Sequence, residues 1–150
     1  MQRRSLVATD FRDALALYQT LNTTPSASDG PDGSRAFAEL LAHQGTQIIG
    51  AEVGGHIVSM ATLHILPNMT YAGRPYALVE NVVTAAAHQG RGLGTALMQH
   101  VLQSAWDAGC YKVMLLTGQA YGARGFYEKL GFSADDKVGM TLRRAPVRTP

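Results

Sequence analysis

A glycine-rich run, residues 89–95, contains the residues best suited to hold a ligand. It reads Gln-Gly-Arg-Gly-Leu-Gly-Thr and stands between a strand-like segment that ends near Val83 and an amphipathic segment that begins near Arg91. Glycines at alternate positions lack the Cβ atoms that would keep a ligand away from the main chain. The first turn of a helix adds unpaired N–H groups and the positive end of the helix dipole. The run therefore predicts a backbone cradle for a phosphate group.

Two well-known phosphate-binding motifs do not fit this run. The dinucleotide fingerprint G-x-G-x-x-G would start at Gly90 and would need glycine at position 95, where the chain has Thr95. That fingerprint also needs an acidic residue about 20 positions further on, and residues 109–117 contain none. A Walker loop needs glycine followed by lysine, a pair that the chain lacks. The pattern that remains is Q-x-x-G-x-G, formed by Gln89, Gly92 and Gly94.

A second motif lies further along the chain, where residues 126–132 read Phe-Tyr-Glu-Lys-Leu-Gly-Phe. Together, Q-x-x-G-x-G and F-Y-x-x-x-G-F resemble the motifs of the GNAT N-acetyltransferase superfamily. The resemblance implies transfer of an acetyl group from acetyl-coenzyme A to an amine. Residues 109–112, Gly-Cys-Tyr-Lys, are also similar to glucosamine-6-phosphate N-acetyltransferases, a similarity shared by many bacterial relatives. The resemblance is most specific between Tyr76 and Phe132.

The resemblance implies a general base and a general acid. An alkyl ammonium has a pKa near ~10, so a base helps to free the attacking amine at neutral pH. Glu80 is the candidate base because it interrupts an apolar run; the alternative is a glutamate that faces solvent or an arginine, and His64 is a possible substitute base. Tyr127 matches the tyrosine that protonates the departing thiolate. The structural alternative for Tyr127 is packing beside Phe126 and Phe132.

The same resemblance implies which residues contact acetyl-coenzyme A. A main-chain N–H near Val82 or Val83 would polarise the thioester carbonyl, because a fixed dipole in a dry cleft stabilises developing negative charge. Arg91 would either reach the pyrophosphate or lie on the outer row of its helix. The expected contacts are Val82, Val83, Thr84, Gln89, Gly90, Arg91, Gly92, Leu93, Gly94, Thr95 and Tyr127.

Composition sets the broad class of protein. With 150 residues and 46% hydrophobic content, the chain suits one compact domain spanning residues 1–150. A net charge of +2 is too small to indicate a nucleic-acid partner. The single cysteine, Cys110, excludes an internal disulfide, and the five histidines show no metal-ligand spacing. No apolar stretch approaches the ~20 residues of a membrane span. We therefore expect a cytoplasmic protein with no metal and no membrane partner; a homodimer is compatible with the sequence.

The first third of the chain predicts one strand and two helices. The strand is expected at residues 5–8, and the first helix runs from Thr9 or Asp10 to about Leu21, before Pro25. Residues 23–33 are rich in proline, glycine, serine and aspartate and predict a surface loop. Ser34 then caps a shorter helix that Gly45 ends.

The rest of the chain predicts a mixed sheet. Strands are expected at 46–53 and 56–66, joined by Gly54-Gly55, and at 76–84. A helix at 91–108 should connect the last of these to a buried parallel strand at 112–117 through a right-handed crossover. A helix at 120–130 and a strand at 138–143 complete the order. This order is similar to the α/β GNAT fold: a mostly antiparallel sheet, splayed at a central parallel pair, with helices on both faces.

The functional hypothesis is an acetyl-coenzyme A-dependent N-acetyltransferase. Acetyl transfer would proceed by direct attack of a bound small-molecule primary amine in a ternary complex. Two alternatives are a protein or peptide amine acetyltransferase and a sensor domain that binds acyl-coenzyme A without turnover. Because a sensor needs neither Glu80 nor Tyr127, these residues favour the enzyme. The family builds its acceptor pocket from regions that correspond to residues 23–35 and 66–74, which contain no recognisable specificity motif.

Overall fold

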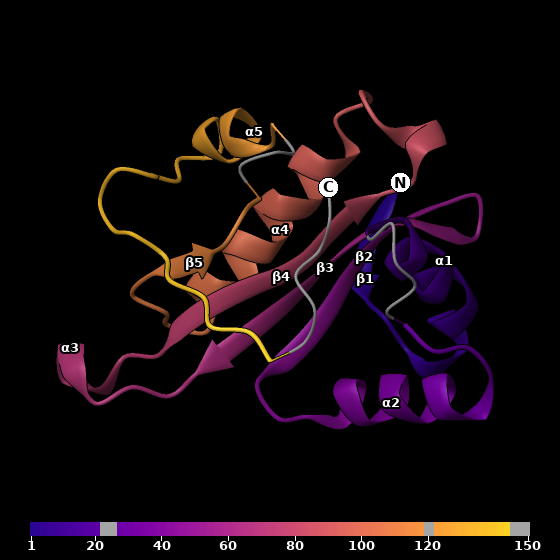
Figure 1. Cartoon of the computed structure of the whole chain (residues 1–150), viewed down its shortest axis with the longest axis horizontal. Helices are drawn as coiled ribbons and strands as arrows, with labels where there is room; N and C mark the ends of the chain where they lie inside the picture. Colours follow the sequence, from indigo (N-terminus) through magenta and orange to yellow (C-terminus); the bar gives the residue numbers. More distant parts are fainter. Residues whose placement is uncertain (22–26, 119–121, 145–150) are drawn as a thin grey trace.

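The computed structural model describes residues 1–21, 27–118 and 122–144. One five-stranded sheet runs in chain order, and its first three strand pairs are antiparallel whereas the last pair is parallel (Figure 1). This mixed sheet confirms the fold class expected from the sequence. Its strands are β1 (Gln2–Ser5), β2 (Thr46–Val53), β3 (His56–Leu66), β4 (Tyr76–Thr84) and β5 (Val113–Leu115).

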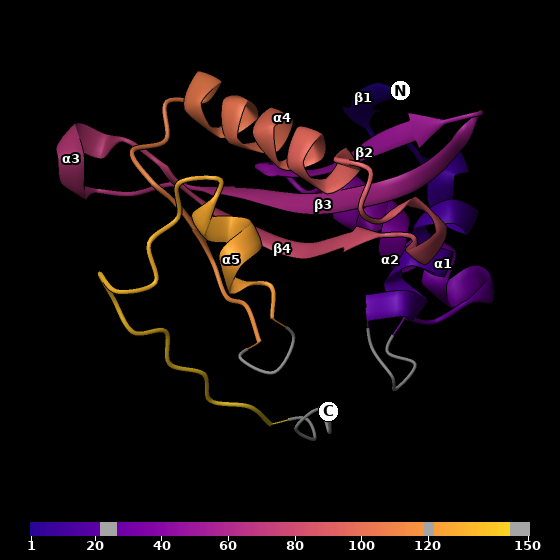
Figure 2. The same ribbon diagram turned by 90° about the horizontal axis from the view of Figure 1, so that it is seen from above.

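Helices cover both faces of the sheet (Figure 2). The helices α1 (Phe11–Leu21) and α2 (Gly30–Ala42) pack on one face, and α4 (Leu93–Asp107) packs on the other. The short helix α5 (Arg124–Glu128) adds side chains to the core beneath α4. The remaining pieces are two 3-10 turns, η1 (Ala8–Asp10) and η2 (Ala86–His88), and the turn labelled α3 (Thr70–Gly73).

Two hydrophobic cores follow from this layering. Leu97, Met98 and Val101 of α4 are fully buried against Leu63 and Val79 of the sheet. On the opposite face, the buried residues come from α1, α2 and the alternate positions of the strands: Leu6, Ala14, Leu17, Phe37, Ile48, Ile57, Met60 and Val83. Neighbouring strand residues point to opposite faces, so each strand supplies both cores.

A bulge interrupts β4 within its pairing with β3. Thr62 of β3 pairs with Glu80, and Met60 pairs with Val83, so Ala61 alone faces two residues of β4. Asn81 takes up the extra length in a left-handed conformation with φ 53°. Asparagine tolerates this conformation better than most residues. A bulge bends its strand and re-aims nearby side chains, and here it places Val79 and Val83 in different cores.

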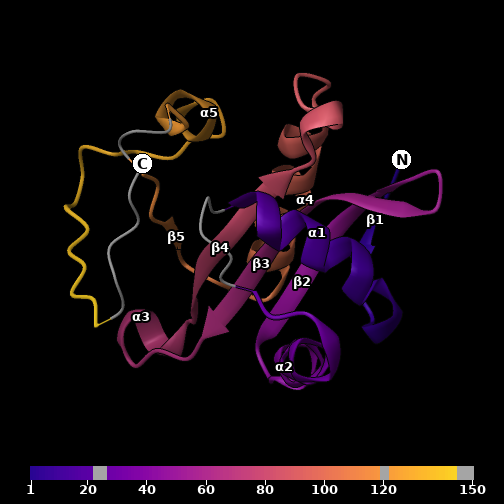
Figure 3. The same cartoon turned by 45° about the vertical axis from the view of Figure 1, so that its right-hand side comes forward.

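β4 and β5 separate immediately before this bulge. Their parallel pairing covers only Ala77–Val79 against β5. Within the described residues, the far edge of β4 from Glu80 to Thr84 therefore has no neighbouring strand. Figure 3 shows the two strands diverging toward α5. This is the splay expected from the family resemblance.

The first strand was placed wrongly by sequence reasoning. It spans Gln2–Ser5 instead of residues 5–8, because Arg4 is fixed in place by ion pairs with Asp10 at 2.7 Å and Glu52 at 2.8 Å. Val7 instead precedes the 3-10 turn, where its N–H donates to Asp10. An edge strand of polar residues lacks the apolar alternation that marks a strand in sequence.

The second helix begins earlier than Ser34. It starts at Gly30, with Asp29 at its N-cap and Pro31 in its first turn, a position where proline costs no hydrogen bond. The predicted surface loop at 23–33 is therefore wrong for its last four residues, and its residues 23–26 lie outside the described part of the chain. Gly33 is needed within the helix, because a Cβ there would collide with the carbonyl of Ser28.

The C-terminal third also differs from expectation. β5 has three residues and is half-exposed rather than buried, and α5 begins at Arg124; residues 120 and 121 of the predicted helix lie outside the description. Residues 138–143 form no strand. Val138, Met140 and Leu142 are exposed by 88%, 92% and 101%. Their apolar alternation is real, but a strand exists only where a neighbouring edge pairs with its backbone, and this segment has no such pairing here.

Tyr18 of α1 points its hydroxyl into the core against Thr62. Both hydroxyls are buried, and among the described residues neither has a partner in full hydrogen-bond geometry. Burial raises the pKa of Tyr18, and a weak interaction with the neighbouring Thr62 hydroxyl lowers it in part. A buried polar group without a partner destabilises the native state by about 1–3 kcal/mol. The pair therefore weakens the fold at neutral pH.

We expect Tyr18→Phe to leave the free energy of unfolding at pH 7 unchanged or to raise it, by up to about 1 kcal/mol. Because the folded pKa of Tyr18 lies above the unfolded value, its contribution to stability is present below about pH 10 and is lost as pH rises through the folded pKa. The variant should therefore lose less stability than wild type above pH 10. Denaturant titrations at pH 7 and above pH 10 measure both effects, with Thr62→Val as the matched removal of the other hydroxyl. A clear loss of stability at pH 7 in Tyr18→Phe would contradict an unpartnered hydroxyl.

Candidate active site

A cleft of about 550 Å³ opens where β4 and β5 diverge. The end of β4, the glycine-rich run and α5 line it. Of the expected cofactor contacts, all but Arg91 lie on its walls. The lining residues are Val82, Val83, Thr84, His88, Gln89, Gly90, Gly92, Leu93, Gly94, Thr95, Ala123, Phe126 and Tyr127.

The glycine-rich run forms the expected cradle of N–H groups. Gly92 is the N-cap of α4 and adopts φ 77°, and Gly90 adopts φ 71°; glycine reaches this left-handed region without strain. Within the described residues, no N–H group of residues 90–95 donates a hydrogen bond to another part of the chain. The first internal bond of the helix starts at Ala96, whose N–H donates to the carbonyl of Gly92. These free N–H groups and the dipole of a 15-residue helix suit a pyrophosphate.

Gly94 keeps the cradle close to the end of β4. A Cβ at this position would lie 3.5 Å from the Thr84 hydroxyl and 3.6 Å from the ring of Phe126. These are ordinary contact distances, so a methyl group would fit the free protein while filling the space between helix and strand. The glycine therefore leaves room for a ligand.

Gln89 has a structural contact as well as a place on the cleft wall. Its side-chain amide donates to the carbonyl of Thr84 at 3.0 Å. This bond joins the end of β4 to the start of the cradle and fixes their relative position. The glutamine of the Q-x-x-G-x-G pattern thus binds the main chain of the protein itself. The sequence pattern alone does not reveal this role.

The two candidate catalytic residues lie near the splay. Glu80 is half-buried and stands one residue before the bulge, opposite Thr62. Tyr127 is half-buried on α5, with edge-on contacts to Phe126 at 5.0 Å and Phe132 at 6.0 Å between ring centroids. Burial raises the pKa of Tyr127, and the charge of Glu80 raises it further. The phenol therefore holds its proton at neutral pH, with the carboxylate close enough to influence it.

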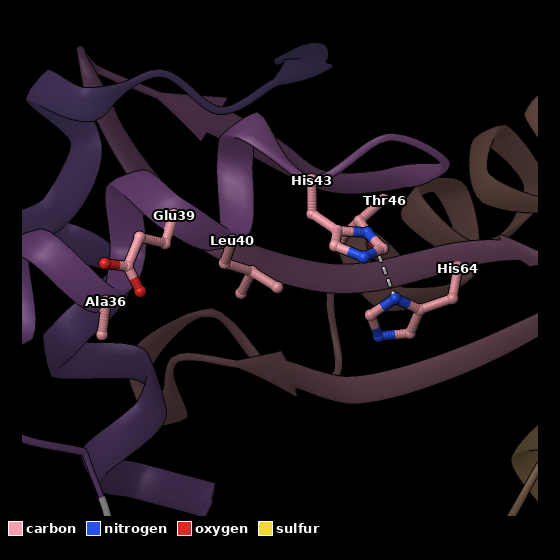
Figure 4. Close-up of a pocket in the computed structure, with 6 residues that line it drawn as sticks. All are labelled: Ala36, Glu39, Leu40, His43, Thr46 and His64. Carbon is pink, nitrogen blue, oxygen red and sulfur yellow. Dashed lines mark hydrogen bonds between the residues drawn. The ribbon is translucent and has the colours of Figure 1, made fainter.

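His64, the alternative base, lies in a different cavity. Its Nδ1 is 2.9 Å from the Thr46 hydroxyl, which is also 3.1 Å from Nδ1 of His43 (Figure 4). This cavity has a volume of about 360 Å³ and is lined by Ala36, Glu39, Leu40, His43, Thr46 and His64. His64 follows Thr62 by two residues on the same face of β3, about 7 Å further along the strand. The structure therefore does not bring His64 into the cofactor cleft.

Arg91 is the one expected cofactor contact that does not line the cleft, and its contact with the pyrophosphate stays a prediction. Arg91 is exposed, and its Nη1 lies 3.5 Å from Nδ1 of His88. Three residues outside the expected set also line the cleft, namely His88, Ala123 and Phe126. Phe126 could have been found, because it opens the F-Y-x-x-x-G-F motif. His88 and Ala123 belong to no motif, and only the fold brings them to the cleft.

Two features are absent from the described residues. Residues 1–21, 27–118 and 122–144 contain no group of three histidine, cysteine or acidic side chains placed to hold a metal ion. Within the same ranges, no helix combines the length and the apolar character needed to cross a membrane.

Comparison with known proteins identifies the family and the fold. Residues 14–132 match the model of the acetyltransferase (GNAT) family. The chain is 32% identical over 137 residues to a glucosamine 6-phosphate N-acetyltransferase of Trypanosoma brucei brucei, covering 91% of this chain and 92% of that protein. A putative acetyltransferase from Agrobacterium tumefaciens has a similar structure, with a TM-score of 0.89, 42% identity and coverage of 96% of this chain and 100% of its own.

A plant enzyme has the same fold. The crystal structure of glucosamine-6-phosphate N-acetyltransferase from Arabidopsis thaliana gives a TM-score of 0.80 at 25% identity, covering 96% of this chain and 98% of that chain. Family, fold and open N–H cradle agree with one another. The chain thus belongs to the acetyltransferase (GNAT) family and is an acetyl-coenzyme A-dependent N-acetyltransferase.

Proposed function

We propose that this enzyme acetylates a primary amine of a small molecule by direct attack in a ternary complex. The observation that carries the proposal is the arrangement along β4. The free N–H groups of residues 90–95 lie at the end of this strand, and Glu80 lies four residues before that end. A cofactor held by its pyrophosphate would extend along the open edge of β4 toward Glu80.

Glu80 is proposed as the general base. The acceptor amine is mostly protonated at neutral pH, and only about one molecule in a thousand is the free base. Glu80 would accept the proton from this ammonium, directly or through water, as the nitrogen attacks. A main-chain N–H on the unpaired edge of β4 near Val82 or Val83 would stabilise charge on the carbonyl oxygen. Bound acetyl-coenzyme A supplies the activated acetyl group.

Tyr127 is proposed as the general acid. Its raised pKa means that the phenol is protonated at neutral pH and can give its proton to the departing sulfur. A thiol has a pKa near ~8.5, so the thiolate is a tolerable leaving group even without this proton. Tyr127 should therefore matter less than Glu80.

Glucosamine 6-phosphate is the first acceptor to test. The Trypanosoma and Arabidopsis proteins bear that activity in their names and align with nearly the whole chain. Residues 66–74, which border the acceptor side in the family, hold a left-handed turn at Tyr71 and Ala72. Arg74 anchors this turn to the connection between α4 and β5 by donating to the carbonyls of Gly109 and Cys110.

A panel of acceptors tests the proposal directly. Release of coenzyme A thiol is followed with glucosamine 6-phosphate, glucosamine, a polyamine and a lysine-containing peptide as acceptors. We expect turnover with one or more of the small amines and the best kcat/KM with glucosamine 6-phosphate. Turnover with the peptide alone would overturn the small-molecule proposal in favour of a protein acetyltransferase. Binding of acetyl-coenzyme A without turnover on any acceptor would favour a sensor.

We propose that residues 1–150 form one acetyltransferase domain; the packing of both cores on a single sheet supports this. A homodimer stays a prediction. Sedimentation velocity at several protein concentrations measures it.

A further inference from the structure

Ser59 lies directly behind the cofactor cleft. It is fully buried on β3 and pairs across the sheet with Thr84, the last residue of β4. The Ser59 hydroxyl lies 2.9 Å from the carbonyl oxygen of Val83 and 2.7 Å from the Thr84 hydroxyl. Neither GNAT motif contains Ser59.

The positions of the protons follow from these two contacts. A carbonyl oxygen can only accept, so the single proton of Ser59 is directed at Val83. The bond between the two hydroxyls must then use the proton of Thr84, with Ser59 as the acceptor. The opposite assignment would leave the oxygens of Ser59 and Val83 facing each other at 2.9 Å without a proton. Thr84 is therefore left with lone pairs and no free proton.

The Thr84 oxygen lies beside the phosphate cradle. Thr84 lines the cleft, and a Cβ on Gly94 would be 3.5 Å from its Oγ1. The Gln89 side chain holds the carbonyl of the same residue. Thr84 thus stands where the helix start meets the end of the strand, between the N–H groups of residues 90–95 and the open edge of β4.

Hydrogen-bond donors of the cradle and the acceptor oxygen of Thr84 therefore lie next to each other at this point. The cradle offers N–H donors and attracts phosphate oxygens. The Thr84 oxygen offers only lone pairs, which repel a phosphate oxygen and accept a hydrogen bond from an N–H or O–H group. A ligand whose pyrophosphate occupies the cradle must present a donor next to it, and not a further phosphate.

We propose that Ser59 makes the Thr84 hydroxyl a selectivity element by accepting its hydrogen bond. The Thr84 oxygen then favours ligands in which a pantetheine arm follows the pyrophosphate over ligands in which a further phosphate follows it. This inference rests on the proposed placement of the pyrophosphate on residues 90–95. A pantetheine arm carries hydroxyl and amide donors, whereas a nucleoside triphosphate carries acceptors. Ser59 is a positioning residue, because it acts through Thr84 and does not touch the ligand.

Two probes isolate the effect. Dephospho-coenzyme A and ATP share adenosine 5′-pyrophosphate and differ only in the group that follows it. We expect Ser59→Ala to weaken binding of dephospho-coenzyme A by about threefold to tenfold, the size of one hydrogen bond. ATP should bind as well as or better than to wild type, because the Thr84 hydroxyl can then turn its proton toward a phosphate. Isothermal titration calorimetry measures both affinities on one preparation.

Thr84 variants supply the matched controls. Thr84→Val should lower the preference for dephospho-coenzyme A over ATP about as much as Ser59→Ala does. Adding Ser59→Ala to Thr84→Val should cause no further change in that preference, because the two residues act as one unit. Thr84→Ser should keep the wild-type preference, since its hydroxyl can donate to Ser59. Circular dichroism and thermal melts confirm that each variant is folded.

Three results would overturn the inference. The first is an unchanged preference for dephospho-coenzyme A over ATP in folded Ser59→Ala and Thr84→Val. The second is an equal loss of affinity for both ligands. The third is additive effects of Ser59→Ala and Thr84→Val on that preference in the double variant. Failure of the proposed function looks different, because wild type would then bind neither coenzyme A nor dephospho-coenzyme A. If Ser59→Ala does not fold, the comparison of Thr84→Val with Thr84→Ser still decides whether the hydroxyl sets the preference.

Discussion

Replacing Gly92 by aspartate is expected to weaken coenzyme A binding by at least about 100-fold while the protein stays folded. No heavy atom lies within 4 Å of a Cβ built at this position, so the new side chain meets no clash. Its carboxylate would cap the N–H groups at the start of α4 and place a negative charge where the pyrophosphate binds. The φ of 77° at Gly92 adds a backbone cost of about 1–2 kcal/mol, which a folded domain tolerates.

Gly92→Asn is the matched control for this experiment. Asparagine has the shape of aspartate and tolerates the left-handed conformation, but it carries no charge. The affinity of Gly92→Asn for coenzyme A should fall between those of wild type and Gly92→Asp. Gly92→Asn should bind coenzyme A at least about tenfold more tightly than Gly92→Asp does. Calorimetry gives the affinities, and thermal melts report folding. Wild-type affinity in folded Gly92→Asp would show that the pyrophosphate binds elsewhere.

Glu80→Gln is expected to lower turnover roughly 100-fold at pH 7. Glutamine keeps the shape of the side chain but cannot accept the proton of the acceptor amine. The deficit should shrink as pH rises toward about 10, because the free amine then becomes plentiful without a base. Steady-state kinetics with saturating acceptor from pH 7 to pH 9.5 measure the effect, and the KM for acetyl-coenzyme A should change little.

Two further variants separate the role of Glu80 from its alternatives. Tyr127→Phe should reduce turnover less than Glu80→Gln at pH 7, because the thiolate can leave unprotonated. His64→Gln should leave the pH profile unchanged, since His64 contacts Thr46 in a separate cavity. Full turnover in Glu80→Gln would remove Glu80 as the base. Loss of turnover in His64→Gln would instead identify the histidine.

Local pattern was enough to predict the centre of the sheet. β2 and β3 begin and end where their apolar runs do, and Gly54 and Gly55 both adopt positive φ in the turn between them. Two-residue hairpin turns of this kind need φ above zero at both positions. β4 and the crossover helix were also predicted to within two residues. In each case the residues that set the structure are neighbours in sequence.

The predictions from sequence are wrong where contacts between residues far apart in the chain determine the structure. β1 is held by ion pairs across the sheet and to η1, and residues 138–143 have the apolar alternation of a strand but no partner edge. The bulge at Asn81 depends on the register between β3 and β4, which no single strand reveals. Among the site residues, the motifs identified most of the cleft wall. They could not reveal the contact of Gln89 with Thr84, which depends on the 3-10 turn η2 between them, or the buried Ser59, which reaches Thr84 through the pairing of β3 with β4.

The bulge in β4 also bears on how such an enzyme can diversify. Glu80 is paired with Thr62, which lies against α1, whereas the phosphate cradle belongs to α4 on the opposite face. One strand thus connects two layers that share few side chains. With the acceptor beside Glu80, as proposed, substitutions on α1 and α2 would reshape its surroundings while the cradle on α4 stays intact. Gene duplicates of this chain could therefore acquire new acceptors and inherit the same acetyl donor.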